Sequence, residues 1–315
     1  MRVVSDPSAL THGARDHLFR SRERVRPLQV RRHVALAGTI DSARRSGEQC
    51  LTPPLGSGWR NRYDRRSGGS LTLAREDIAY KTRDHRFRSR DEYAQGKYDV
   101  TSRWLAPSIR NGEPGRLLVN VGCGSGEYNA TARALGLRVL ACEPEAEAFA
   151  LASRHAADGC DVVRCGLMDL GNHAGTADFV VMHDVLEHIE DDVAAVAALR
   201  DLLKPDAVAV ISVPAYPWLF GHHDVQLGHF RRYTRRSLLA LFRGDDFEIE
   251  ASRYYGAALI PIALWFSRIS RRPYPVARAS EGVAQRVMRA ICQSESRIAM
   301  PVGTSVLLRV RRRCR

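Results

Sequence analysis

Short apolar runs alternate with longer amphipathic stretches from about residue 115 to the end of the chain. The runs are rich in valine and each ends at a polar residue, a glycine or a proline, which is typical of strands buried on both faces. Five such runs lie at 116–122, 138–144, 161–166, 177–183 and 207–214. We therefore predict the strands of a mostly parallel sheet.

The segments between these runs have helical spacing. In 146–157 and 191–204, alanine and leucine recur on one helical face and charged residues flank them. Strands that alternate with helices predict right-handed βαβ units, and hence an α/β fold with a doubly wound sheet. Further along, we expect a helix at 235–243, a strand at 247–255 and a last strand at 304–312.

The first 70 residues differ from the rest of the chain. They contain fourteen arginines, no lysine and six acidic residues, with scattered Gly, Ser and Pro and no periodicity, which predicts a disordered Arg-rich extension. Three interpretations stay open: an RNA-binding or anchoring arm, a floppy extension, and translated sequence ahead of a true start near residue 70. We expect a helical cap at 71–114 and the main domain at 115–315.

The formal charge of +13 comes almost wholly from arginine. It is compatible with nucleic acid, an anionic membrane surface or acidic substrates, and also with coding bias. The seven cysteines include no C-x-x-C pair, so we expect neither a zinc finger nor a disulfide framework, and we predict a cytoplasmic protein. The apolar run at 256–266 is too short to span a bilayer, and the N-terminus lacks the apolar run of a signal peptide.

The sequence VNVGCGSGEY at 119–128 carries a glycine-rich turn between a strand and a helix. Gly122, Gly124 and Gly126 allow the backbone to turn sharply and to approach a ligand closely, while the helix start offers free N–H groups and a positive dipole end. The spacing is G-x-G-x-G, with Glu127 where the dinucleotide fingerprint G-x-G-x-x-G requires its third glycine, so this loop alone is weak evidence.

An acid follows at the end of the next predicted strand. Glu143 lies 19 residues beyond Gly124, where a carboxylate can accept hydrogen bonds from both ribose hydroxyls of a nucleoside. A tight glycine turn also has a purely steric explanation. The strand, turn, helix and acid together favour a nucleoside site.

These motifs, together with ADFVVMHDVLEHIEDD and LRDLLKPDAVAVISVPAYP, resemble class I S-adenosylmethionine-dependent methyltransferases. The resemblance covers roughly 90–255 and is strongest to the small-molecule branch that is similar to ubiquinone-biosynthesis O-methyltransferases. It implies S-adenosyl-L-methionine as cofactor and a Rossmann-like sheet of seven strands in the order 3-2-1-4-5-7-6. In that order the antiparallel last strand, 304–312, inserts between 207–214 and 247–255.

The same resemblance implies the residues that hold the cofactor. Gly122, Cys123 and Gly124 would line its methionine end, and Glu143 would hold the ribose. We predict a cofactor set of Asn120, Gly122, Cys123, Gly124, Gly126, Glu143, Met168 (on adenine) and His183 (closing the pocket).

Two positions depart from the family pattern. The family usually has Asp or Glu where this chain has Asn120, and often an acid where it has Gly166. Asp169 is a candidate substitute for the second acid. These departures also motivate an alternative, that the chain binds cofactor without catalysis.

The hexapeptide HDVLEH invites a metal-site interpretation. The zinc-binding signature H-E-x-x-H places its histidines four apart on one helical face. His183 and His188 are five apart and diverge by about 140° on a helix. We therefore predict no metal site here, and mostly structural roles for 186–188.

The sequence GHHDVQLGHFRRYT at 221–234 follows the fifth predicted strand. Because ligands of α/β sheets bind beyond the carboxyl ends of the strands, we predict that residues 215–234, the acceptor loop, form a wall of the acceptor site. Methyl transfer to a hydroxyl needs an aligned acceptor and a group that removes its proton. His223, paired with Asp224, and His229 are the candidate catalytic bases.

Other side chains of the acceptor loop are candidates for binding the substrate. We predict that His222, Arg231, Arg232 and Tyr233 contact an anionic or hydroxylated acceptor. The alternative is that the loop's polar groups hydrogen-bond its own backbone. Thr234 is expected to cap the following helix.

A helical insertion is expected at 256–300. Its apolar run with Trp265 and Phe266 precedes Arg268, Arg271 and Arg272. One interpretation is peripheral contact with a membrane that carries a lipid-linked substrate. We favour a helix that covers the sheet edge or a dimer contact.

The predicted function is methyl transfer from S-adenosyl-L-methionine to a small-molecule acceptor, at a hydroxyl of a glycan, polyketide, quinone or lipid-linked compound. The charge motivates a nucleic-acid methyltransferase as the alternative. Against it, the sequence after the fourth strand has no N-P-P-Y-like or D-P-P-Y-like motif, and the chain shows no RNA-binding module.

Overall fold

The computed structural model describes residues 91–110, 115–270 and 282–314. All of them belong to one compact unit, Gly69–Arg315. The predicted extension at 1–70 and the first part of the predicted cap lie outside the described residues.

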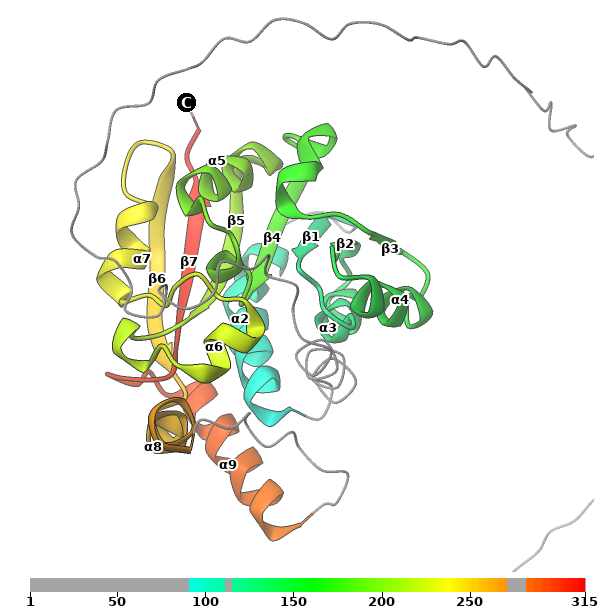
Figure 1. The fold of residues 1–315 in the computed structure, drawn as a ribbon. Helices are drawn as coiled ribbons and strands as arrows, with labels where there is room; N and C mark the ends of the chain where they lie inside the picture. Colours follow the sequence, from blue (N-terminus) through cyan, green and yellow to red (C-terminus); the bar gives the residue numbers. More distant parts are fainter. Residues whose placement is uncertain (1–90, 111–114, 271–281, 315) are drawn as a thin grey trace, which may run out of the picture. The chain divides into compact units, whose positions relative to one another are not determined.

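Seven strands form a single sheet in the order β3-β2-β1-β4-β5-β7-β6, as the family resemblance predicted. β1 to β5 run parallel to one another, and β7 pairs antiparallel with both β5 and β6. Figure 1 shows the last strand, in red, between the green β5 and the yellow β6. The strands are β1 (Leu117–Val121), β2 (Arg138–Cys142), β3 (Cys160–Val163), β4 (Ala177–His183), β5 (Leu203–Pro214), β6 (Phe247–Tyr255) and β7 (Ser305–Arg312).

Helices and helical turns connect these strands, and the predicted helices at 146–157, 191–204 and 235–243 are present with slightly shorter bounds. The α-helices are α2 (Glu92–Arg110), α3 (Glu127–Ala134), α4 (Ala146–Arg154), α5 (Asp192–Leu202), α6 (His222–Leu227), α7 (Arg235–Leu241), α8 (Ile260–Leu264) and α9 (Val283–Arg297). Shorter turns are η2 (Leu167–His173), η3 (Leu186–His188), η4 (Pro217–Leu219) and η5 (Ala257–Leu259), and η6 (Trp265–Ser270) is π-helical.

Helices cover both faces of the sheet. Alternate strand residues point to opposite faces, so Val119 packs on one side with Leu199 of α5, while Leu118 packs on the other side with Leu105 of α2 and Tyr128 of α3. All five side chains are nearly inaccessible to water. Burial on both faces explains why the strands read as almost continuous apolar runs.

The junction between α5 and β5 differs from the sequence prediction. The helix was expected to run to residue 204, but α5 ends at Leu202 and β5 begins at Leu203. The reason is Pro205, because the residue before a proline is driven out of helical backbone angles and into extended ones. Asp206 then takes a positive φ of 60° before the strand continues.

The predicted insertion at 256–300 contains η5, α8, η6 and α9. Glu295 of α9 ties the end of the insertion to its start, directly after β6. Its carboxylate accepts hydrogen bonds from the backbone N–H groups of Gly256, Ala257 and Ala258, each at 2.8 Å. α9 also packs along α2, where Arg289 pairs with Glu92 at 2.9 Å. Within the described ranges, no helix combines the length and apolar composition needed to cross a bilayer.

Candidate functional site

The carboxyl ends of β1, β2, β4 and β5 lie side by side in the sheet, and the predicted site residues follow these ends. The turn after β1 contains Gly122, Gly124 and Gly126 at φ of 63°, 59° and 89°, a region that favours glycine. At Gly122 an added Cβ would stand 2.5 Å from Cγ2 of Val185. This glycine therefore lets the turn after β1 pack directly against the turn after β4.

Glu143 is fixed at the end of β2 and is buried, with 6% of its surface exposed. Its Oε2 accepts the backbone N–H of Gly124 at 2.8 Å, and its Oε1 accepts the N–H of Glu145 at 3.0 Å. The carboxylate is thus held rigidly against the glycine turn. A carboxylate in this position has the acceptor chemistry that the two hydroxyls of a ribose require.

Asn120 and Cys123 are buried beside that turn. The Asn120 amide donates to Oδ1 of Asn129 at 2.7 Å and so ties β1 to α3. The backbone N–H of Cys123 donates to the carbonyl of Cys142 at 3.0 Å, which joins the turn to β2. Burial raises the pKa of the Cys123 thiol, so it stays protonated and unreactive. Both residues shape the turn, and their direct contact with cofactor stays a prediction.

Met168 lies on η2 after β3 and exposes 57% of its surface, which is high for a methionine. An exposed thioether at this position is suited to stack on a ligand ring. The Asp169 carboxylate, the expected substitute for the family acid, accepts the N–H of Gly166 at 2.8 Å. It therefore stabilises the start of η2.

His183 ends β4 inside an aromatic cluster. Its Nε2 lies 2.8 Å from Oγ1 of Thr101, and its ring centroid lies 5.0 Å and 5.2 Å from those of Tyr98 and Tyr128. Tyr98 and Thr101 belong to α2, so this helix contacts the end of β4, and the cap over the cofactor stays a prediction. His183 is 8% exposed.

A polar cluster that the sequence did not predict follows immediately. Asp184 adopts a positive φ of 56°, which is strained for an aspartate, and it accepts hydrogen bonds from Ser212 Oγ of β5 at 3.1 Å and from Lys97 Nζ of α2. The Lys97 side chain is only 4% exposed. The strain at Asp184 is offset by these contacts from two other elements.

The acceptor loop begins and ends at one point of the sheet. Tyr216 N–H donates to the carbonyl of Tyr233 at 2.8 Å, and Tyr233 N–H donates to the carbonyl of Pro214 at 2.9 Å. Tyr216 has a positive backbone φ of 62°. Its ring stacks on those of Trp218 and Tyr254, with centroid distances of 5.5 Å and 5.4 Å. Both ends of the loop are therefore held at the carboxyl end of β5.

Asp224 is the centre of the acceptor loop and is fully buried. Its Oδ1 lies 2.8 Å from Nδ1 of His229 and 2.7 Å from Nε of Arg232, and its Oδ2 accepts the N–H of Gly221 at 2.9 Å. Burial pushes the pKa of this carboxyl up, but the His229 hydrogen bond and the Arg232 charge outweigh it and lower the pKa to about 2. The partner that the sequence suggested for Asp224 was His223, and the structure adds His229.

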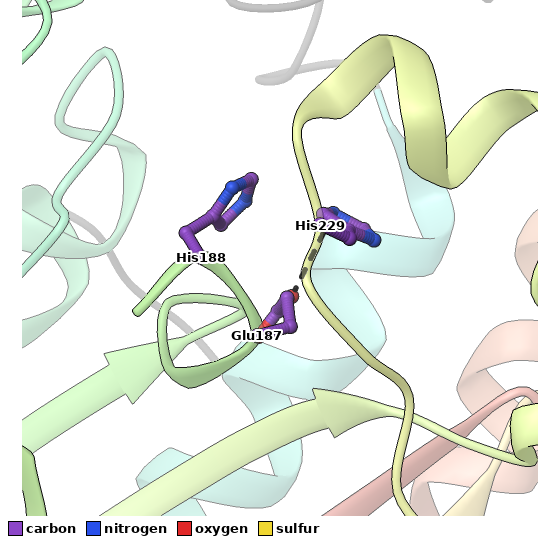
Figure 2. Close-up of side chains that lie close together, drawn as sticks. All are labelled: Glu187, His188 and His229. Carbon is purple, nitrogen blue, oxygen red and sulfur yellow. Dashed lines mark ion pairs between the residues drawn. The ribbon is translucent and has the colours of Figure 1, made fainter. Parts of the chain in front are cut away.

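The contact with Asp224 sets the tautomer of His229. An ionised carboxylate only accepts hydrogen bonds, so Nδ1 carries the proton and Nε2 of the neutral ring carries a lone pair. Nε2 lies 4.0 Å from Oε1 of Glu187, which is too far for a hydrogen bond. The His188 ring lies edge-on to that of His229, with centroids 4.6 Å apart. Figure 2 shows Glu187, His188 and His229 grouped between η3 and the segment after α6.

The predicted substrate-binding residues lie in different settings. Arg232 is buried against Asp224, and Tyr233 is buried with its hydroxyl donating to Oδ2 of Asp192 at 3.0 Å. Arg231 also pairs with Asp192, at 2.9 Å. His222 is exposed at the start of α6. Arg232 and Tyr233 therefore stabilise the acceptor loop, and contact of these four residues with substrate stays a prediction.

His223 has an environment unlike that of His229. Desolvation by burial lowers its pKa from 6.5 to about 3, and the positive charge of Arg232 adds to this effect. Below pH 6.5 the unfolded chain binds a proton at this residue while the folded chain does not, so stability falls as the pH drops from 6.5 towards 3.

The acid sensitivity of the fold is expected to decrease when His223 is replaced by glutamine. At pH 5 the wild type should lose up to about 2 kcal/mol relative to pH 7 through this residue, and the variant should not. Urea denaturation at both pH values measures the difference. An equal loss of stability in both proteins would contradict the neutral state of His223 in the folded protein.

Comparison with known proteins matches this geometry to a family. The family model described as a methyltransferase domain matches residues 85–252, which is more than half of the chain. This chain belongs to the methyltransferase domain family. It contains an S-adenosylmethionine-dependent methyltransferase domain, with the sheet order of that fold.

The curated relatives are distant. The chain is 29% identical over 147 residues to an uncharacterized methyltransferase of Mycobacterium ulcerans, a match that covers 44% of this chain and 56% of the relative. It is 29% identical over 103 residues to the ubiquinone biosynthesis O-methyltransferase of Xanthomonas campestris pv. campestris, covering 31% and 43% of the two chains. The chain thus spans about half the length of the curated relatives it matches.

A solved structure agrees with the fold. One chain of a Haloferax volcanii complex that contains the Trm112 methyltransferase activator aligns with a TM-score of 0.51 at 17% identity. The alignment covers 78% of this methyltransferase and 98% of that chain. At this identity the likeness concerns the fold alone.

The described residues of this methyltransferase fit its cofactor. When bound, S-adenosyl-L-methionine supplies an electrophilic methyl group on a positively charged sulfur. The buried carboxylate of Glu143 would hold the ribose, and the exposed Met168 would pack on the base. The turn at 122–126, with positive φ at its three glycines, would lie along the rest of the cofactor. The N-terminus of α3 follows that turn and contributes the positive end of a helix dipole.

Proposed function

We propose that this methyltransferase transfers the methyl group to a hydroxyl of a small-molecule acceptor that binds against the acceptor loop. The observation that carries the proposal is the buried Asp224–His229 pair, joined at 2.8 Å. It lies just beyond the carboxyl ends of β4 and β5, the edge at which ligands of such sheets bind. A hydroxyl is a poor nucleophile until it loses its proton, so its methylation requires a group of this kind.

His229 is better suited than His223 to activate the hydroxyl. Its Nε2 lone pair is left available by the hydrogen bond between Nδ1 and Asp224, and that bond also orients the ring. His223 has a pKa of about 3 and is a weak base at neutral pH. Of the two histidines predicted as catalytic, we therefore assign the activating role to His229.

The acceptor loop also offers apolar surface for the body of the acceptor. Trp218 and Phe230 expose 49% and 52% of their surface. Exposed aromatic rings on a loop with both ends fixed suit an acceptor that combines hydroxyls with an apolar or ring-shaped body. The acceptors that we propose are accordingly hydroxylated quinones, polyketides, and glycan or lipid-linked compounds.

A panel of acceptors tests this function. The purified full chain is incubated with methyl-labelled S-adenosyl-L-methionine and with pairs of compounds that differ only in a free or a pre-methylated hydroxyl. We expect label in the free-hydroxyl member of at least one pair and none in its partner, measured by mass spectrometry. Label that enters only amine compounds, or only RNA in a parallel incubation, would overturn the proposal.

A further inference from the structure

We propose that Glu187, His188 and His229 bind a divalent cation of the zinc type beside the acceptor. This inference deepens the proposed function and rests on it for the catalytic role of the cation, although the binding itself is a separate property. The predicted absence of a metal site at HDVLEH rested on the five-residue spacing of His183 and His188. The structure instead brings His188 together with a histidine of the acceptor loop.

The three side chains offer one ligand atom each, and these atoms lie within 4.8 Å of one another. Glu187 and His188 are consecutive residues of η3, and His229 follows α6 (Figure 2). Glu187 is fully buried, His229 is largely buried and His188 is exposed. Two ligands are therefore fixed in the protein, while the third, His188, is accessible to solvent.

The two segments that carry the ligands are fastened together at the site. The N–H of Phe230, the residue after His229, donates to the carbonyl of Glu187 at 2.8 Å. The N–H of His229 itself donates to the carbonyl of Asp224 at 2.9 Å. The separation between the ligands is thus set by the backbone and is not left to two independent loops.

The hydrogen bond to Asp224 gives His229 the state that a metal ligand needs. Metal-binding histidines usually donate their second ring N–H to a carboxylate, which fixes the tautomer and makes the free nitrogen more basic. Here Nδ1 donates to Asp224, and Nε2 points to the cluster. Asp224 is in turn held by Arg232 and by the N–H of Gly221, so the supporting residues are themselves fixed.

The ligand set indicates the kind of ion. Two imidazoles and one carboxylate are the three protein ligands of many catalytic zinc sites, which keep a fourth position for water or substrate. Ligands bound to zinc in a tetrahedron stand about 3.3 Å apart, so the cluster has to close by about 1 to 1.5 Å on binding. The exposed His188 is able to make this movement by rotating its side chain.

The position of the cluster suggests what the cation does. It lies after β4 and β5, next to the acceptor loop, so an acceptor hydroxyl is able to occupy the fourth position. A cation lowers the pKa of an oxygen bound to it, and the hydroxyl proton leaves to water. The oxygen then bonds to the methyl carbon as the carbon–sulfur bond breaks, and that electron pair stays on sulfur. His229 in this scheme activates the hydroxyl through the cation.

Metal titration tests the site without cofactor or acceptor. The full chain is stripped with a chelator, dialysed and titrated with Zn²⁺ by calorimetry, and with Co²⁺ by visible absorption. We expect one equivalent to bind, with affinity at least tenfold weaker in His188→Ala and in His229→Ala. His155→Ala removes an exposed histidine at the end of α4 and should bind as the wild type does.

The possible results separate this inference from the proposed function. A wild type that binds no Zn²⁺, or a His188→Ala variant that binds it as tightly, would overturn the site and assign any binding to other groups such as cysteine thiols. If the enzyme methylates a hydroxyl at the full rate after the chelator has removed all metal, the role of the cation is overturned. The proposed O-methylation would still stand. Stoichiometric binding that depends on His188 supports the site even where no panel compound is methylated.

Discussion

Replacing His229 with alanine is expected to lower the rate of methyl transfer by about 10²–10³-fold, the range typical for loss of a group that assists removal of a proton. The ring is the only side chain of the described acceptor loop that joins the buried Asp224 to the Glu187 and His188 cluster. Its removal abolishes activation of the hydroxyl, whether the lone pair takes the proton or binds a cation. Affinity for S-adenosylhomocysteine should change less than about twofold, because the cofactor residues lie on other strands.

The matched control for this experiment is His223→Gln. This histidine is six residues earlier in the same loop, but its pKa of about 3 makes it a weak base, so the variant should keep its rate within a few fold at pH 7. Single-turnover kinetics with labelled cofactor separates the chemical step from binding. A His229→Ala enzyme with the wild-type rate, or a larger loss in His223→Gln, would refute the assignment of the activating role.

Glu143→Ala is expected to weaken cofactor binding by about 100-fold. A hydrogen bond to a charged group contributes about 1.5–3 kcal/mol, and two ribose hydroxyls would lose such bonds together. The carboxylate also accepts the N–H groups of Gly124 and Glu145, so its removal loosens the glycine turn as well. Calorimetry with S-adenosylhomocysteine measures the loss of affinity.

Two further variants separate ribose binding from support of the turn. Glu143→Gln keeps the shape and one acceptor oxygen, so we expect an affinity between those of the wild type and the alanine variant. Glu147→Gln changes an exposed carboxylate on α4 and should bind as the wild type does. Unchanged affinity in a folded Glu143→Ala protein, with folding checked by circular dichroism, would show that Glu143 does not hold the cofactor.

The central strands were predictable because a strand that is buried on both faces consists almost entirely of apolar residues. The run at 177–183 coincides with β4, in which every residue but one is buried, so packing selects nearly every position. The run at 247–255 coincides with β6, although only the two end residues of this edge strand are buried. The order of the strands came from the family resemblance, because apolar runs alone do not say which strands are neighbours. Residues 85–252 carry that resemblance.

The contacts within the site were less predictable. Adjacency in sequence suggested His223 as the partner of Asp224, but consecutive residues on a helix point about 100° apart. Gly228 ends α6 with a φ of 74° and reverses the chain, and this brings His229 back to Asp224. A sequence pattern does not encode the direction in which a chain leaves a left-handed glycine.

Pairs from distant segments were missed for the same reason. The ion pair between Lys97 and Asp184 joins residues 87 positions apart, and no local spacing indicates it. The prediction of no metal site rested on the spacing of His183 and His188, and that spacing takes no account of His229 from another loop. The one available signal was that a segment containing histidines follows each of two neighbouring parallel strands, β4 and β5.

A crystal structure of the full chain with S-adenosylhomocysteine tests the central claim most directly. The account predicts both ribose hydroxyls within hydrogen-bond distance of Glu143, and the sulfur facing the space between the turn after β4 and His229. A cofactor bound away from Glu143, or a sulfur that faces away from the acceptor loop, would contradict it.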